Sequence, residues 1–279
     1  MKTKFILLLS IVFKIGFSQT ETEVAGITYH YFSKADYNDK TANSFTNKLE
    51  TFVNYGHNLG TKTTLFYHVD FKKFIINTSL DTNAIYPKIA SHELLTAAIG
   101  MKNEFKNNWS LVTIFTNTFS DDFSKSNLDR LSYIRSFLYV NKKKSDLFSY
   151  GFGLYVSTVS ENIRILPVLS LAVKSKKKGM KLFFPRYVKF WYKTNDKSYI
   201  QLQTKLNSKR IKYNSDIIQS VEIFTVISDV TYNYLLKKKF KFALGFSFPI
   251  QQYSYDLDAY KSNQIGGFGV TTGISYVVF

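Results

Sequence analysis

Hydrophobic and small or polar residues alternate along much of the chain, and residues 240–250 show the pattern most clearly. Every second residue from Phe240 to Ile250 is a large apolar one, and the residues between them include Lys241, Ala243, Gly245 and Ser247. Successive side chains of a β-strand point to opposite faces. The segment therefore predicts a strand with one apolar face and one small or polar face.

The same alternation recurs at a length that separates membrane strands from soluble ones. It is present in 65–72, 95–102, 148–157, 163–173, 224–234 and 268–278. Several of these segments run to roughly ten residues, the length that a tilted strand needs to cross hydrocarbon, whereas soluble strands usually have about 5–6 residues. The pattern predicts an all-β fold, an antiparallel transmembrane β-barrel with its apolar face toward lipid and its other face toward the lumen.

Membrane helices are not expected. The longest apolar stretch after residue 18 is Ile165–Val173, which contains Pro167 and Ser170 and falls well short of the ~20 residues of a membrane-spanning helix. Two other segments, 109–119 and 130–141, carry apolar residues on both faces, and residues 199–206 are only weakly apolar. The pattern leaves open which face of these segments points outward.

The connections between strands predict the orientation and the strand number. Short polar links occur at 56–60, 106–108, 141–146, 174–179, 194–197 and 237–239, and longer ones at 33–44, 77–92, 120–129, 206–215 and 251–266. Short turns of outer-membrane barrels face the periplasm. We expect fourteen strands if 178–184 and 187–193 are separate strands joined at Pro185-Arg186. If 25–32 is no strand and 178–193 is one, the number is twelve.

The first residues have the features of a secretory signal peptide. Lys2 and Lys4 precede a mostly apolar run, and the small residues Gly16 and Ser18 stand where cleavage needs them. We expect residues 1–18 to be the signal peptide and residues 19–279 to form the barrel in the outer membrane of a Gram-negative envelope. A retained amphipathic anchor is the alternative.

The charge of the chain suggests a partner. The formal net charge is +17, and removal of residues 1–18 with their three lysines lowers it to +14. In an exported protein such a charge predicts contact with phosphates of outer-membrane lipid and lipopolysaccharide. Nucleic acid is not expected, because no aromatic platform accompanies the lysine runs at 142–144, 176–178 and 237–239. The absence of cysteine excludes disulfides and thiolate chemistry.

Three further features carry a family resemblance. They are the opening segment 25–29 (AGITY), the Phe183-Phe184-Pro185 turn followed by an aromatic strand, and the final glycine-bearing strand. With these features the chain resembles a family of outer-membrane β-barrels of unknown function. The resemblance implies a membrane barrel and supplies no activity. The terminal Phe279 resembles the signal by which the barrel-assembly machinery recognises such strands, although it lies out of phase with the apolar face.

The residues that bear chemistry are few. His68 and Asp70 share a strand face, and a histidine oriented by a carboxylate acts as a general base in many enzymes. Residues two apart on a strand lie about 7 Å apart, and no serine nucleophile motif is present, so we expect no catalytic residue. The acid pairs Asp121-Asp122 and Asp256/Asp258 lack the spacing of a calcium loop. No metal or cofactor is expected.

The polar face supplies candidates for the lumen. These are His68, Asp70, Lys72, Lys102, Lys205, Asp229 and Lys241. Because charges in a lumen determine selectivity, the sequence favours a narrow pore for small polar or anionic solutes. One alternative is a closed-lumen structural or interaction barrel, and a lower-ranked one is a membrane-embedded hydrolase that uses His68.

Overall fold

The computed structural model describes residues 22–37, 42–80, 92–121, 131–159, 163–212, 220–255, 261–265 and 267–278. Residues 1–18, the expected signal peptide, and Phe279 lie outside these ranges. Among the described residues, no helix has the length and apolar character needed to cross a bilayer.

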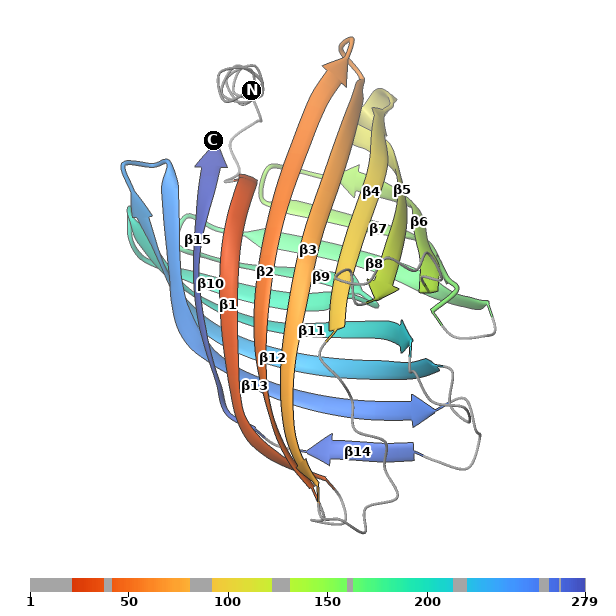
Figure 1. Cartoon of the computed structure of the whole chain (residues 1–279). Coiled ribbons are helices and arrows are strands. Elements are labelled where there is room, and N and C mark those ends of the chain that lie inside the picture. The colour runs from red at the N-terminus through yellow and green to blue at the C-terminus, as the bar shows by residue number, and fades with distance from the viewer. Residues whose placement is uncertain are drawn as a thin grey trace, which may run out of the picture.

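The described chain is built almost entirely of antiparallel strands (Figure 1). They are β1 (Thr22–Tyr37), β2 (Ala42–Leu59), β3 (Thr63–Leu80), β4 (His92–Glu104), β5 (Trp109–Asp121), β6 (Leu131–Lys143), β7 (Phe148–Ser157), β8 (Arg164–Lys174), β9 (Lys178–Phe184), β10 (Tyr187–Asn195), β11 (Ser198–Lys212), β12 (Ser220–Leu236), β13 (Phe240–Tyr255), β14 (Lys261–Ile265) and β15 (Gly269–Val278). Each pairs with the next along the chain up to β14, and β15 pairs with β1 and β13, which closes the barrel.

The fourteen-strand prediction is confirmed. Strands β14 and β15 follow one another along the same two neighbours, β13 and β1, so they occupy a single position in the wall. The closed barrel therefore has fourteen positions. The expected break at Pro185-Arg186 is a turn between β9 and β10, and the Phe184–Pro185 peptide bond is cis.

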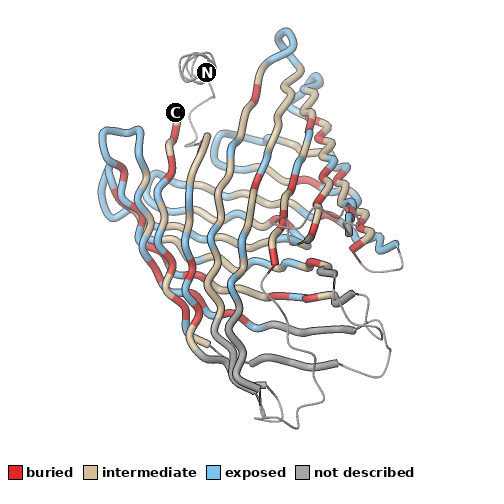
Figure 2. The backbone as a smooth tube through the Cα atoms, in the orientation of Figure 1, coloured by how far each residue is buried: buried red, intermediate tan, exposed pale blue. Residues whose placement is uncertain are grey.

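The outer surface of the barrel is an apolar belt. On β13, Leu244 and Phe248 are 61% and 49% exposed, while the intervening Gly245 and Ser247 are buried (Figure 2). Exposed large apolar side chains occur in the same way on β1 to β13 and on β15. A soluble surface rarely carries a contiguous apolar patch of this kind. The belt is the lipid-facing surface of a transmembrane barrel, because all the strands whose side chains the structure describes contribute to it.

The structure also assigns the faces that the sequence left open. In β5 the buried Val112 and Thr118 point inward and Phe115 points outward, and in β6 the buried Phe137 points inward and Leu138 outward. In β11 the outward residues are Ile200 and Leu202, and Gln201, Gln203 and Lys205 share the inner face.

Both described chain ends lie at the rim that carries the short turns (Figure 1). The turns at this rim span 60–62, 105–108, 144–147, 175–177, 196–197 and 237–239. At the other rim the strands reach further than the pattern predicted. In the expected link 33–44, for example, Ala35 pairs with Ser44 and Asp36 with Asn43. Backbone N–H and C=O groups pair whatever their side chains, so polar residues do not end a strand.

One side of the barrel bends into a tight corner. Strands β9 and β10 have only seven and nine residues, and the inward side chains Phe137, Tyr155, Val168 and Phe183 of β6 to β9 form a buried cluster. Beyond the β9–β10 turn, β11 approaches β5 and β6 to within 8 Å between Cα atoms although it pairs with neither. This cluster, which we call the aromatic corner, therefore fills the space among β6 to β10, and polar side chains line much of the rest of the interior.

Candidate functional site

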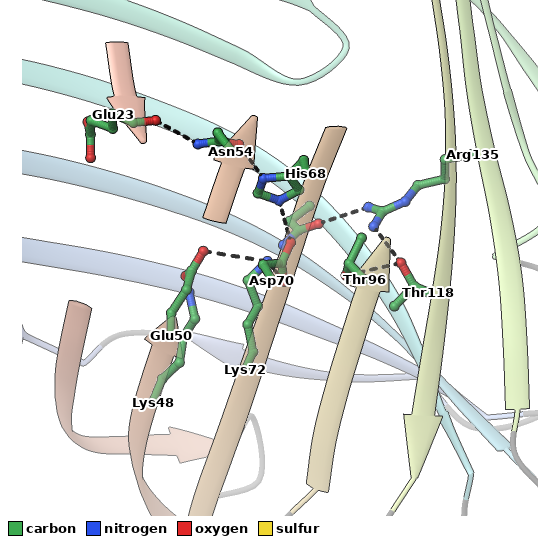
Figure 3. Close-up of polar contacts among 11 residues, drawn as sticks. Glu23, Lys48, Glu50, Asn54, His68, Asp70, Lys72, Thr96, Thr118 and Arg135 are labelled. Atoms are coloured by element: carbon green, nitrogen blue, oxygen red, sulfur yellow. Dashed lines mark hydrogen bonds and ion pairs between the residues drawn. The ribbon is translucent and has the colours of Figure 1, made fainter. Parts of the chain in front are cut away.

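Ion pairs link the inner faces of β2 and β3 (Figure 3). Lys48 Nζ lies 2.5 Å from Glu50 Oε2, and Lys72 Nζ lies 3.5 Å from Glu50 Oε1 and 2.9 Å from Asp70 Oδ1. Glu50 and Lys72 stand directly opposite one another in the ladder, a position in which opposite charges stabilise a sheet. These four side chains form an alternating row of charges.

His68 joins this row through both of its ring nitrogens. Its Nε2 lies 2.8 Å from Asp70 Oδ2 and its Nδ1 lies 2.6 Å from Asn54 Oδ1 (Figure 3). The bond to Asp70 corrects the expectation that residues two apart on a strand are too distant, because the side chains lean toward one another along the strand. Asn54 Nδ2 donates to the Glu23 carbonyl over 2.8 Å, which orients the amide. Neither imidazole nitrogen is left to accept a proton from a nucleophile.

Contacts cross the interior from β4–β6 to β11. Arg135 Nη2 donates to Thr118 Oγ1 over 3.1 Å, and Arg135 Nη1 reaches Asn207 Oδ1 on β11 at 3.5 Å. Lys209 Nζ, also on β11, lies 2.9 Å from His92 Nε2 on β4 and 3.4 Å from the centre of the Phe74 ring on β3. These contacts narrow the interior because they join strands on opposite walls.

A hydrogen-bonded ladder completes the polar interior on the remaining wall. Lys205 Nζ lies 3.4 Å from Asp229 Oδ2, and Ser247 Oγ lies 2.6 Å from both Asp229 Oδ1 and Thr271 Oγ1. Thr271 Oγ1 in turn lies 2.8 Å from the Nδ1 of the buried His30. His30 pairs with Lys48 in the β1–β2 ladder, so this ladder meets the charged row of β2 and β3.

We call this set of inward side chains the polar belt. It consists of His30, Lys48, Glu50, His68, Asp70, Lys72, His92, Thr96, Thr118, Arg135, Lys205, Asn207, Lys209, Asp229, Ser247 and Thr271.

The polar belt has more cations than carboxylates. It holds five Lys or Arg side chains, Lys48, Lys72, Arg135, Lys205 and Lys209, against the three carboxylates of Glu50, Asp70 and Asp229. Among the described residues, neither Arg135 nor Lys209 has a carboxylate within ion-pair distance. The Nε of Arg135 is buried without a hydrogen-bond partner. The belt therefore presents uncompensated positive charge to the interior.

Five of the seven residues predicted for the lumen lie in the polar belt: His68, Asp70, Lys72, Lys205 and Asp229. The other two are on the same inner face but elsewhere. Lys241 pairs with Glu23. Lys102 lies near the short-turn rim, 2.5 Å from Glu104, and its side chain is 42% exposed.

Four charged members of the polar belt were not predicted, for different reasons. Lys209 falls in a segment expected to be a loop, and Arg135 in a strand whose faces the pattern left open. Lys48 and Glu50 share the inner face of β2 with Phe52, and this aromatic residue obscured the polar character of that face. Only the position of these strands opposite one another reveals the group.

The short-turn rim is rich in lysine, and one acid there is perturbed. The Lys143 ammonium lies 2.6 Å from the Asp146 carboxylate in the turn after β6. Its hydrogen bond and its charge lower the pKa of the Asp146 carboxyl. Within the described part of the chain, no three His, Asp or Glu side chains are placed to hold a metal ion. The carboxylates of Asp122, Asp256 and Asp258 lie outside the described residues, and that of Asp121 is likewise not described.

Comparison with known families places the chain in one of them. Residues 15–256 match the family described as Domain of unknown function (DUF6268). The chain belongs to this DUF6268 family. The membership agrees with the resemblance drawn from the sequence and, as the description says, brings no activity with it. No curated protein matches the sequence of this DUF6268 chain.

Solved barrels resemble this DUF6268 protein at low sequence identity. An outer membrane channel from Pseudomonas putida F1 is 11% identical, with 95% of this chain and 100% of that one covered and a TM-score of 0.48. The KdgM porin in complex with disordered oligogalacturonate is 11% identical, with 91% and 99% covered and a TM-score of 0.36. The Pseudomonas putida toluene transporter TodX is 9% identical, with 91% and 88% covered and a TM-score of 0.36. No solute is transferred from these proteins to this chain.

Proposed function

We propose that this protein is a narrow pore in the outer membrane of a Gram-negative envelope and that it prefers small anions. The observation that carries the proposal is the polar belt, in which five cations and three carboxylates line the barrel interior. The short-turn rim faces the periplasm in this proposal, and the other rim faces outside.

The charge of the polar belt is the basis of selectivity. Fixed charges in a narrow, partly dehydrated passage act on ions more strongly than charges at a wide, wet surface, because water screens them less. Lys48, Lys72 and Lys205 are neutralised by carboxylate neighbours. Arg135 and Lys209 are not, so they add net positive charge to the potential that an ion in the passage meets.

Planar-bilayer conductance tests the proposal. The folded protein is expected to give stable openings whose reversal potential in a potassium chloride gradient indicates anion preference. The double variant Arg135→Gln/Lys209→Met leaves three cations and three carboxylates in the polar belt, so its reversal potential is expected to move toward zero. Lys102→Gln, which removes a lysine near the rim, is the matched control and leaves the preference in place. Cation preference in the unaltered protein contradicts the proposal.

A closed-lumen barrel is the second candidate, and the contacts of β11 across the interior favour it. Arg135 and Lys209 join β6 and β4 to β11, so side chains span the interior from one wall to the other where β11 approaches β5 and β6. If protein that shows the heat-dependent gel mobility of a folded barrel gives no openings, the closed barrel replaces the pore. The hydrolase hypothesis has no support in the geometry, because both ring nitrogens of His68 are engaged.

The proposed location also implies partners. The exposed lysines of the turns 144–147, 175–177 and 237–239 are placed to contact phosphates of membrane lipid at the periplasmic surface. Lipopolysaccharide is the corresponding partner at the opposite rim, and the C-terminal strand β15 together with the terminal residue Phe279 is the segment offered to the barrel-assembly machinery. Binding of the protein to vesicles with and without anionic phospholipid tests the contact between the turn lysines and lipid phosphate. If this contact is made, the binding is expected to weaken as the salt concentration is raised.

A further inference from the structure

Three outward side chains form a row across β5, β6 and β7 near the short-turn rim. Trp109 stands opposite Lys142 in the β5–β6 ladder, and Lys142 stands opposite Tyr150 in the β6–β7 ladder. Their positions are in phase with the exposed apolar residues of the lipid-facing belt. The Lys142 ammonium lies 5.1 Å from the centre of the Trp109 ring, and the ring centres of Trp109 and Tyr150 are 6.3 Å apart. A cation thus stands between two aromatic side chains, and we call the three residues the Trp–Lys–Tyr row.

The ammonium of this row has no carboxylate partner among the described residues. Lys142 donates one hydrogen bond to the carbonyl of Asn107 in the turn before β5, and an ammonium group has three donors. Asp146 and Glu104, the acids beside the two adjoining turns, each pair with a different lysine. The positive charge of Lys142 is therefore available to an anion that approaches the outer surface of the barrel.

The two aromatic residues of the row supply further donors. Within the described part of the chain, neither the indole N–H of Trp109 nor the hydroxyl of Tyr150 has a hydrogen-bond partner. Both side chains are half-buried, and Trp and Tyr favour the boundary between hydrocarbon and lipid headgroups. The row therefore combines a positive charge with N–H and O–H donors, which is the chemistry that recognises a phosphate group.

The same three strands become apolar toward the middle of the membrane. The next outward residues after the row are Leu111, Val140 and Phe152, and they too stand opposite one another. Leu138 and Leu154 pair in the row after that and are 50% and 52% exposed. A cationic row followed by apolar rows along the same strands fits an amphiphile that has its negative charge at one end.

We infer that the Trp–Lys–Tyr row is a binding site for one anionic phospholipid, with the lipid phosphate at the Lys142 ammonium and an acyl chain along the apolar residues of β6 and β7. A headgroup with a net negative charge is favoured because the ammonium of a zwitterionic headgroup repels Lys142. The inference deepens the contact with lipid phosphate proposed above for the turn lysines, since it assigns a single lipid to a defined place on the barrel wall. It does not depend on conduction through the lumen.

Native mass spectrometry of the folded full-length protein, with lipid titrated into the detergent, counts the bound lipids. The probes are phosphatidylglycerol, which has a net negative charge, and phosphatidylcholine, which has none. We expect one phosphatidylglycerol to bind about fivefold more tightly than phosphatidylcholine. Inorganic phosphate at the same concentration is expected not to displace it, because the site also binds the acyl chain. Displacement by inorganic phosphate, or equal affinity for the two lipids, overturns the inference.

Variants assign the binding to the row. Lys142→Gln is expected to remove the preference for phosphatidylglycerol, Lys142→Arg to keep it, and Trp109→Leu to weaken the binding of both lipids. The controls are Lys176→Gln, in an exposed turn, and Tyr67→Leu, an aromatic residue that stands opposite Tyr55 in the β2–β3 ladder. Both controls are expected to leave the binding unchanged. If Lys176→Gln and Lys142→Gln reduce the preference equally, the lipid is attracted to the rim as a whole and the site is refuted.

Fluorescence quenching by brominated lipid locates the contact in a bilayer. The chain has two tryptophans, Trp109 and Trp191, so Trp191→Phe leaves Trp109 as the only one. We expect phosphatidylglycerol with brominated acyl chains to quench Trp109 more strongly than brominated phosphatidylcholine at the same mole fraction in vesicles. Lys142→Gln is expected to abolish this difference. Equal quenching by the two lipids while Lys142 is present contradicts the site.

The outcomes for the lipid site and for the pore are distinguishable. Protein that conducts anions selectively but binds both lipids alike refutes the site and leaves the pore. Protein that binds phosphatidylglycerol through Lys142 but never conducts refutes the pore and leaves the lipid site.

Discussion

Arg164 on β8 donates two hydrogen bonds to the carboxylate of Glu222 on β12, each 3.0 Å long, although β9, β10 and β11 separate these strands in the sheet. The contact is made where β8 continues beyond the end of the β9–β10 hairpin. The short hairpin leaves a notch in the wall between β8 and β12, and this ion pair joins the two strands across the notch. The pair therefore links two strands that are not hydrogen-bonded neighbours in the sheet.

We expect reversal of either charge in this pair to destabilise the barrel. Arg164→Glu or Glu222→Arg alone replaces a two-point attraction by repulsion and is expected to lower the free energy of unfolding by about 1–2 kcal/mol. The double reversal is expected to recover most of the loss. Urea unfolding in lipid vesicles, analysed as a double-mutant cycle, measures the coupling.

The exposed pair Lys102–Glu104 is the control for that cycle. Its side chains are 42% and 55% exposed, so its coupling is expected to be below about 1 kcal/mol. If the coupling energy of Arg164–Glu222 is no larger than this, the contact between β8 and β12 stabilises the barrel no more than an ordinary surface ion pair does.

The aromatic corner predicts a difference between two adjacent phenylalanines. Phe183 is buried, with ring centres 5.6 Å from Phe137 and 5.3 Å from Tyr139, whereas Phe184 points outward and is 38% exposed. Phe183→Ala leaves a cavity and is expected to lower the free energy of unfolding by about 3–5 kcal/mol. Phe184→Ala, which removes the same atoms from the lipid face, is expected to do much less. If unfolding experiments in vesicles give the same loss of stability for both variants, the tight packing of Phe183 in the aromatic corner is contradicted.

The turn between β12 and β13 is strained, and we expect suitable substitutions in it to raise the stability of the barrel. Lys237 and Lys238 have φ angles of 51° and 54°, a region that costs a residue with a Cβ roughly 1–2 kcal/mol. Lys237 and Lys238 are the two central residues of a β-turn that the hydrogen bond from the Lys239 N–H to the Leu236 carbonyl closes, and Asn-Gly is favoured where both central residues have positive φ. We expect Lys237→Asn/Lys238→Gly to raise the unfolding free energy by about 1 kcal/mol. Lys176→Asn/Lys177→Gly in the turn after β8, where neither lysine has a positive φ, is the control, with no such gain expected.

Gly100 on β4 is covered by the ring of Phe66 on the paired strand β3. A Cβ at Gly100 lies 1.9 Å from the nearest ring carbon, whereas a Cβ at Gly273 lies 3.0 Å from its nearest neighbour, the Thr28 hydroxyl oxygen. Gly100→Ala must displace a ring in the barrel interior and is expected to cost about 1–3 kcal/mol. Gly273→Ala, whose Cβ also lies 3.1 Å from the Ile27 carbonyl oxygen, needs a smaller adjustment and is expected to cost less than Gly100→Ala. The same unfolding measurements compare the two variants, and similar losses refute the account.

Much of this architecture follows from the local pattern. The period-two alternation in 240–250 predicts its outward phenylalanines and its inward Gly245 and Ser247, and both are found. The link at Pro185-Arg186 predicts the separate strands β9 and β10 and with them the number fourteen. The pattern fails for the strand ends, since 206–215 reads as a loop although β11 continues to Lys212. It also failed for the distance between His68 and Asp70, which depends on side-chain conformation.

The sequence by itself determined the class of the protein, because side-chain alternation along a strand is a local property that any window of ten residues reveals. Only the tertiary structure decided which charges meet. Arg135 reaches Asn207, which lies 72 residues further along the chain, and β11 comes close to the wall of β4 to β6 because the short β9–β10 hairpin lets the barrel bend inward. That curvature arises from pairings between distant strands, and no local pattern encodes it.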